Sequence, residues 1–438
     1  MNKRGPRHDD LLPSAPLAFA YPLQVPGPDL NDAVLVAELP PAYALAVLRA
    51  YRLVLTYATS ESVDALDPAA LEAWEQVILG NAEAWDPEVW NALTVIVSEL
   101  RGPAPVDQHW IALACMTLME WALKHGARNA AVCIAEAAAL VVPANARYAY
   151  VVGRMYRERG RLREAELWLE RSRRVAVWHA DREAISVALN SLGNLAQLRG
   201  RYAEAEELLH SALRVAKRAR LRDRQAAVYH DLLVVAVYTG KLAKGIEYAR
   251  AAFGAYSPDH PSLLKLAHDV AYLWSEHGHH GRALQIFAAL LPHFAEPEAR
   301  LRVLGYAARS AGAIGDQEAY SRYSTEAWSI IDSGDAEHLR AAAALELGVG
   351  ALSVGLWDEA KRALEAALER AADAGDNEVI VKASEALDRL RRRDYVEVVH
   401  RPSTGRIRRP EDELVGQLVL ALGHYKPPAD SETSDRAT

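Results

Sequence analysis

Histidine forms the densest group of potentially reactive side chains in this sequence. Three histidines fall within the stretch from His277 to His280, and His268 precedes them on the same expected helix. Imidazole binds zinc, copper and nickel, so the group is a candidate metal site for a metal-dependent enzyme. Because His279 and His280 are adjacent, their side chains diverge, and Glu276 is the only carboxylate close by. We therefore favour a polar turn between helices and predict no metal site.

Two His-Asp pairs, His230-Asp231 and His268-Asp269, also combine residue types that exchange protons. They recur at equivalent places along the chain, and recurrence fits a scaffold surface better than a unique active site. The phosphate-binding pattern GxxxxGK[ST] and the zinc-protease pattern HExxH are both absent from the sequence. We therefore predict that the protein is not an enzyme and uses no cofactor.

A third group of polar side chains has the chemistry of binding. Asn190, Asn194 and Gln197 share one face of an expected helix, and each amide offers a donor and an acceptor to a peptide backbone. Arginine suits bidentate binding of carboxylates. On the expected helix before it, the corresponding face carries Arg147, Tyr150, Arg154 and Arg157. An acidic or carboxylate-ended peptide would fit these residues, and ordinary solvated polar surface is the alternative interpretation.

Glycines that close short turns reveal the elements that position these residues. Their successive spacings are 34, 40, 40, 38, 37 and 40 residues, which is a repeat. The residue seven places before each glycine is mostly Gly or Ala, and the residue five places after it is mostly small, so two antiparallel helices can approach closely. Glycine itself suits a turn that needs a positive φ. The turn glycines are Gly126, Gly160, Gly200, Gly240, Gly278, Gly315 and Gly355.

The order of a mid-helix Gly, a turn Gly, an aromatic residue or Leu, and then Ala resembles the tetratricopeptide repeat family. The units around Gly153, Gly193 and Gly348 carry the pattern most clearly. The resemblance implies an all-α fold, a tetratricopeptide-like α-solenoid of about seven helical hairpins. The family period is about 34 residues, so intervals near 40 imply helices about one turn longer.

The resemblance also implies that the first helix of each hairpin lines a concave groove. Helical spacing then selects the side chains that face this groove. The peptide-binding residues predicted in this way are Arg147, Tyr150, Arg154, Arg157, Asn190, Asn194, Gln197, His230, His268, Tyr272 and Arg309.

Five segments are expected along the chain. Residues 1–40 are predicted to be irregular, and 41–103 form a helical region that is either a separate bundle or degenerate repeats. The repeat array covers 106–376. A capping helix follows at 377–393, and 394–438 hold a linker, a short helix and a disordered tail. The three helices expected in the second segment are Ala42–Tyr57, Pro68–Gly80 and Pro87–Leu100.

Composition limits the class of partner. Hydrophobic residues make up 51% and charged residues 25% of the chain, as in packed proteins. The net charge of -8 argues against nucleic acid as a ligand. We find no signal peptide and no apolar stretch that predicts a membrane span. Cys115 and Cys133 fall on apolar helix faces, which predicts reduced core thiols in a cytoplasmic protein.

The leading hypothesis is a protein-binding scaffold that holds a peptide or partner protein in the groove, with no nucleic acid and no membrane involved. The alternative is a peptide-responsive regulator that resembles bacterial sensors built from a helical bundle and repeats, without a DNA-binding motif of its own. A metal-dependent enzyme that uses the region from His277 to His280 is the third hypothesis. Partner identity and oligomeric state do not follow from the sequence.

Overall fold

A computed structural model describes residues 32–60, 63–102, 105–334, 336–392 and 410–427, and within these ranges every regular element is a helix. The chain divides into two compact units, Met1–Arg224, called the N-terminal unit, and Gln225–Thr438, called the C-terminal unit. None of the helices in the described ranges is long and apolar enough to cross a membrane. The all-α prediction is confirmed.

In the part of the chain that the structure describes, four helices precede the repeats. Two of them begin at an aspartate followed by proline: the carboxylates of Asp67 and Asp86 accept hydrogen bonds from backbone N–H groups at 3.0 and 2.9 Å, and proline occupies the first helical position. The three helices expected here are present. The structure adds one short helix where the sequence predicted irregular chain. The four are α1 (Asp32–Glu38), α2 (Pro41–Ser60), α3 (Pro68–Gly80) and α4 (Pro87–Arg101), with a 3-10 turn at Val63–Ala65.

The added helix α1 is held on the first repeat by its last residue. The Glu38 carboxylate accepts hydrogen bonds from the backbone N–H groups of Asn129 and Ala130 at 2.8 and 3.1 Å. These groups open helix α6 (Arg128–Val141), where a negative charge is favoured by the helix dipole. One hydrophobic core extends from Leu35 to Leu195, so the N-terminal helices and the first repeats are packed together.

Seven antiparallel hairpins follow, as predicted. In the N-terminal unit the members of each hairpin pack along their length, and the second helix then packs on the next hairpin. The pairs there are α5 (Gln108–Lys124) with α6, α7 (Ala146–Glu158) with α8 (Leu162–Trp178), and α9 (Arg182–Leu198) with α10 (Tyr202–Arg218). Helices of 17 residues, such as α8 to α10, match the extra turn expected from the repeat length.

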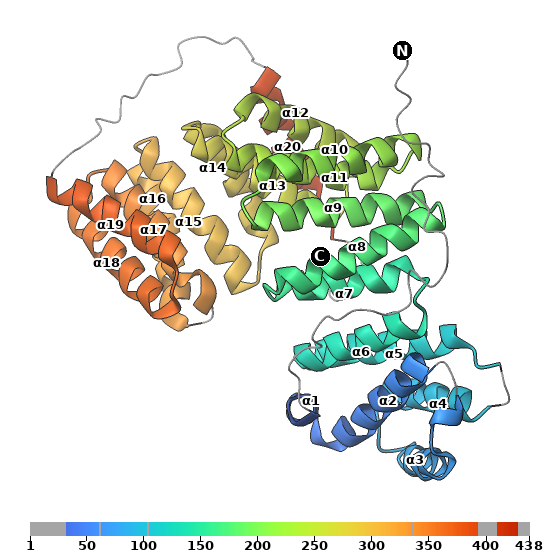
Figure 1. Cartoon of the computed structure of the whole chain (residues 1–438). Helices are drawn as coiled ribbons and strands as arrows, with labels where there is room; N and C mark the ends of the chain where they lie inside the picture. The colour runs from blue at the N-terminus through green and yellow to red at the C-terminus, as the bar shows by residue number, and fades with distance from the viewer. Residues whose placement is uncertain (1–31, 61–62, 103–104, 335, 393–409, 428–438) are drawn as a thin grey trace, which may run out of the picture. The chain divides into compact units, whose positions relative to one another are not determined.

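The C-terminal unit also consists mainly of helices that form hairpins in sequence order (Figure 1). Its hairpins are α11 (Arg222–Tyr238) with α12 (Leu242–Ala255), α13 (Leu263–Glu276) with α14 (His280–Leu290), α15 (Pro297–Ala313) with α16 (Gln317–Ser333), and α17 (Arg340–Ser353) with α18 (Trp357–Ala374). Two 3-10 turns lie at Leu291–His293 and Glu337–Leu339. Helix α19 (Asn377–Arg392) packs on α18, and α20 (Pro410–His424) packs on α14.

Glycine residues allow both the tight turns and the close approach of the two helices in a hairpin. All seven turn glycines have positive φ, between 66° and 77°. The glycine seven places before the turn forms a socket for the leucine nine places after it: a Cβ atom added at Gly153 would lie 2.8 Å from Cγ of Leu169. Gly193 meets Leu209, and Gly348 meets Leu364, in the same way. These leucines therefore fill the space within each hairpin.

The two cysteines are buried free thiols, as predicted. Burial raises the pKa of Cys115 and of Cys133 to about 12, so both stay protonated at neutral pH. A thiolate is the reactive form, and we therefore assign both side chains to packing.

Helix α6 also buries a carboxyl group against the second hairpin. The Tyr156 hydroxyl donates a hydrogen bond to Oε1 of Glu136 at 2.7 Å. Burial nevertheless dominates and raises the pKa of Glu136 to about 7. Glu136 therefore takes up a proton on folding at mildly acidic pH, and the folded state loses stability as the pH rises.

Replacing Glu136 with Gln should remove this pH dependence. Gln resembles the protonated acid, so the variant and the wild type should be about equally stable at pH 5. At pH 8 the variant should be more stable by roughly 2 to 3 kcal/mol, because the wild type must bury a charge. Urea unfolding at both pH values measures the difference, with Glu72→Gln on the exposed surface of α3 as the control. Equal pH profiles for wild type and Glu136→Gln would contradict the prediction.

Candidate functional site

Within each unit some consecutive first helices of the hairpins pack on one another, and the surface that they form is here called the inner face. Helix α7 contacts α9, α13 contacts α15, and α15 contacts α17. The predicted binding residues occupy equivalent places on these helices, ten or six residues before the turn glycine in most cases. The inner face is present in both units, and its chemistry differs between them.

In the C-terminal unit two of the predicted histidines share one carboxylate. Asp269 on α13 contacts Nε2 of His230 on α11 at 2.8 Å and Nδ1 of His268 at 3.1 Å. These interactions lower the pKa of Asp269 although burial opposes the shift, and the hydrogen bond to Asp269 raises the pKa of His230 against its own burial. The His-Asp-His group therefore ties α11 to α13.

The predicted aromatic residue Tyr272 takes part in a second contact between helices. Its ring lies 5.1 Å from the ring of Tyr306 on α15, and His268 lies 5.8 Å from the same ring. Phe287 of α14 stacks on Tyr306 at 5.8 Å. Ring pairs at these separations stabilise packing, so this cluster ties α13 to α15.

The predicted arginine of this unit is already paired with two carboxylates. Nη1 of Arg309 lies 3.0 Å from Glu276 on α13 and 3.0 Å from Glu346 on α17. Burial raises the pKa of Glu346, and the neighbouring guanidinium opposes that rise. Arg309 thus bridges three consecutive first helices.

The residue nine places before the turn glycine of each hairpin explains these contacts. This position supplies Asp269, Tyr306 and Glu346, each of which meets a predicted binding residue on the preceding first helix. The sequence analysis noted Asp269 only as a neighbour of His268 and missed the other two. Polar or aromatic residues at one fixed offset were the available signal. In the C-terminal unit the inner face is therefore occupied by contacts within the protein.

The inner face of the N-terminal unit has a different character. Arg147 is exposed, Tyr150 is partly buried against the core, and Arg157 is partly buried. Nε of Arg154 lies 3.6 Å from Glu158 on the same helix, and the Arg154 side chain is 16% exposed. The residue of α9 that corresponds to Asp269 is Ser191, which is buried. A serine therefore stands here in place of the carboxylate found at this position of α13.

The predicted amide patch lies on the neighbouring helix α9. Asn190, Asn194 and Gln197 are all partly buried, and the side-chain oxygens of the two asparagines are almost fully buried. The structure thus places the patch beside the arginine-bearing helix, since α7 packs directly on α9.

Sequence reasoning missed an apolar part of this face. At the same offsets from its turn glycine, α5 carries Leu113 and Met116 where α7 carries Arg147 and Tyr150. Leu113 is 50% exposed, and Trp110, one helical turn before it, is 54% exposed. The repeat pattern of the first hairpin is weaker. Applying the same offsets to it would have placed Leu113 and Met116 on the inner face.

The histidine cluster separates in space. Nδ1 of His277 lies 2.9 Å from the Leu273 carbonyl oxygen, and Nδ1 of His280 lies 3.4 Å from the Ser275 hydroxyl. The His279 ring stands edge-on to Trp274 at 5.2 Å. Among the residues that the structure describes, no group of three or more His, Cys, Asp or Glu side chains could hold a metal ion.

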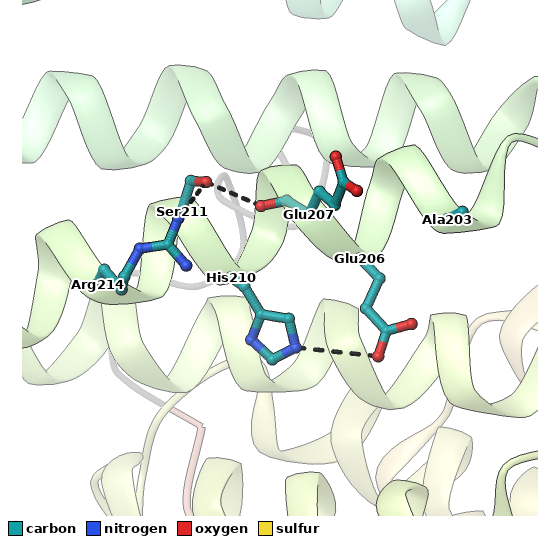
Figure 2. A pocket seen from close by; sticks show the side chains of 6 residues that line it. All are labelled: Ala203, Glu206, Glu207, His210, Ser211 and Arg214. Atoms are coloured by element: carbon teal, nitrogen blue, oxygen red, sulfur yellow. Dashed lines mark hydrogen bonds and ion pairs between the residues drawn. The ribbon is translucent and has the colours of Figure 1, made fainter. Parts of the chain in front are cut away.

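A shallow hollow on the outer side of the N-terminal unit lies on helix α10 (Figure 2). All of its lining residues come from this one helix. His210 and Glu206 approach to 3.9 Å, and Nη2 of Arg214 contacts the Ser211 hydroxyl at 2.8 Å. None of the predicted binding residues lies here, so the hollow offers matched control positions for tests of the inner face.

Comparison with protein families identifies one segment. Residues 186–223 match the tetratricopeptide repeat. The match covers most of α9, all of α10 and the start of α11, which includes the amide patch. None of the curated proteins compared with the chain matches it.

Proposed function

Since this chain contains a tetratricopeptide repeat, we propose that it works by binding a polypeptide in the groove of its N-terminal unit rather than by catalysis. The repeat indicates a scaffold for protein–protein interaction, because stacked helical hairpins expose an extended surface. The proposed site is the inner face formed by α7 and α9, here called the α7/α9 face.

One observation carries the choice of this face. The amides of Asn190 and Asn194 lie half-buried on α9, directly beside the helix that presents Arg147 and Arg157. The amide nitrogens can donate hydrogen bonds to the carbonyl groups of an extended backbone, and guanidinium groups bind carboxylates.

The chemistry of the face indicates the class of ligand. An acidic or carboxylate-ended segment would meet Arg147 and Arg157, and its backbone would meet the amide patch. Exposed Leu113 and Trp110 on α5 would accept an apolar side chain of the same partner. We therefore propose a peptide that combines a carboxylate with at least one apolar residue.

The test is a pull-down from cell extract with mass spectrometry. We expect Asn190→Ala/Asn194→Ala to lose at least tenfold in the capture of partners, because two hydrogen bonds to the ligand are removed. Glu207→Ala/Arg214→Ala on the outer side of α10 should capture as the wild type does (Figure 2). Folded Asn190→Ala/Asn194→Ala that still captures every partner would refute the proposal.

A peptide-responsive regulator is the second candidate, and one packing observation favours it. The N-terminal helices are joined to the repeats directly: α2 packs on α6, and α4 packs on α5. A peptide that tightened the repeats would therefore act on these helices through the core that they share. Hydrogen exchange in α2 and α4 that changes on binding of a captured partner would support this function.

A further inference from the structure

Helix α20 does not behave as a continuation of the repeat stack. It follows the capping helix α19 in the sequence, yet it packs on α14 (Figure 1). Asp412 near its start pairs with Arg282 near the start of α14, and Tyr425 just after its end contacts His293 just after the end of α14. The two helices therefore run parallel, whereas helices within each hairpin are antiparallel.

The contact has the composition of a specific helix-binding surface. Leu414, Val415, Leu418 and Leu422 of α20 form an apolar stripe, and each is no more than 2% exposed. At one end, Nη2 of Arg282 lies 2.8 Å from Oδ1 of Asp412. The opposite side of α20 faces solvent, with Leu420 at 63% exposure.

Helix α20 is also a weak helix by itself. Its 15 residues are near the lower limit for an isolated helix in water, and Gly416 in its interior lowers helix stability further. A Cβ atom at Gly416 would meet no other atom within 4 Å, so this glycine serves no contact with α14. Most of the stability of α20 as a helix must therefore come from the surface on which it lies.

We propose that the surface of α14 covered by α20 is a second binding site of this protein, separate from the α7/α9 face. Its ligand is an amphipathic helix of a partner protein that carries an acidic residue in its first turn and the apolar spacing of Leu414, Val415, Leu418 and Leu422. Helix α20 is the resident occupant of the site, and the partner helix binds by displacing it.

The probe for this site is a fluorescein-labelled synthetic peptide of residues 410–426. The released variant of the full chain is Leu418→Glu/Leu422→Glu, which removes the stripe from the resident helix only. We expect the released variant to bind the peptide at least tenfold more tightly than the wild type, since a tethered helix competes at millimolar effective concentration. Peptide with Gly416→Ala should bind about threefold to fivefold more tightly, because it is the better helix.

Two controls keep the test decisive. Peptide carrying Leu418→Glu/Leu422→Glu should not bind the released variant. Full-length Asp412→Arg loses only the ion pair, so it should bind the peptide with intermediate affinity, and it provides a second measurement if the released variant fails to fold.

Three results would overturn the proposal. One is a folded released variant that does not bind the peptide. Another is equal peptide binding by wild type, Asp412→Arg and the released variant. The third is a wild-type dimer that the free peptide dissociates, because it would assign the site to α20 of a second copy. None of these measurements involves the α7/α9 face. A result that overturns the proposed α14 site therefore leaves the function proposed above untouched.

Discussion

We expect Gly312→Ala to destabilise the protein more than a Gly→Ala substitution at any other glycine that the structure describes. We expect a loss of about 3 kcal/mol and a fall of roughly 5 to 10 °C in the thermal midpoint. Gly312 on α15 faces Gly350 on α17, and an added Cβ atom would lie 2.3 Å from the Gly350 carbonyl oxygen. Thermal unfolding followed by circular dichroism measures the effect.

The size of this effect follows from which atoms collide. At Gly153 an added Cβ atom would press mainly on the side chain of Leu169, which can change its rotamer. At Gly312 it would meet the backbone of Gly350, at its carbonyl oxygen, carbonyl carbon and Cα, so a whole helix would have to move. Helices α15 and α17 pack more closely than other consecutive first helices, and both glycines are required for that approach.

The matched control is Gly281→Ala in α14. A Cβ atom at Gly281 would meet nothing within 4 Å, and the residue lies in a helix. Since Ala is the better helix former, this variant should keep or slightly raise the thermal midpoint. If Gly312→Ala and Gly281→Ala melted at the same temperature, the close approach of α15 and α17 would not matter for stability.

The repeat architecture could be predicted because its determinants are local. Each turn glycine adopts the positive φ that its position in the pattern indicates. The pairing of small residues with leucine is fixed by offsets of a few residues on either side of that turn. Fold class, number of hairpins and helix length all follow from one periodic pattern, and the structure confirms them.

Contacts between consecutive hairpins were much harder to predict. The register of α15 on α17 depends on Gly312 and Gly350, which belong to different repeats, and nothing local to either residue reveals their partner. The docking of α20 on α14 depends on Arg282 and Asp412, which are far apart in the sequence. A helical pattern shows which face of a helix is apolar, but it does not show which surface will cover that face.

The predicted site illustrates the same limit. Helical spacing placed Arg309 and Asn194 at equivalent positions, and the pattern treats them alike. The surroundings of Arg309 come from another repeat, because Glu346 on the next first helix pairs with its guanidinium. Glu276 and Glu346 on the neighbouring first helices therefore assign Arg309 to the fold rather than to a ligand.

Arg309→Met tests this distinction, and we expect the variant to lose about 3 kcal/mol of stability at pH 8. The substitution keeps most of the side-chain volume but leaves Glu276 and Glu346 without their common partner. Burial already raises the pKa of Glu346, and loss of the guanidinium should raise it further. A carboxyl group with a raised pKa in the folded state binds a proton on folding, so the deficit should shrink towards pH 5 and grow as the pH rises.

Urea unfolding of wild type and Arg309→Met at both pH values measures this difference. The double variant Arg309→Met/Glu346→Gln should recover much of the loss at pH 8, because one of the two buried charges has been removed. Capture of partners by the α7/α9 face should remain at the wild-type level in both variants. If Arg309 were instead a ligand-binding residue, Arg309→Met would reduce capture while its stability stayed unchanged, and the assignment of this arginine to the fold would be wrong.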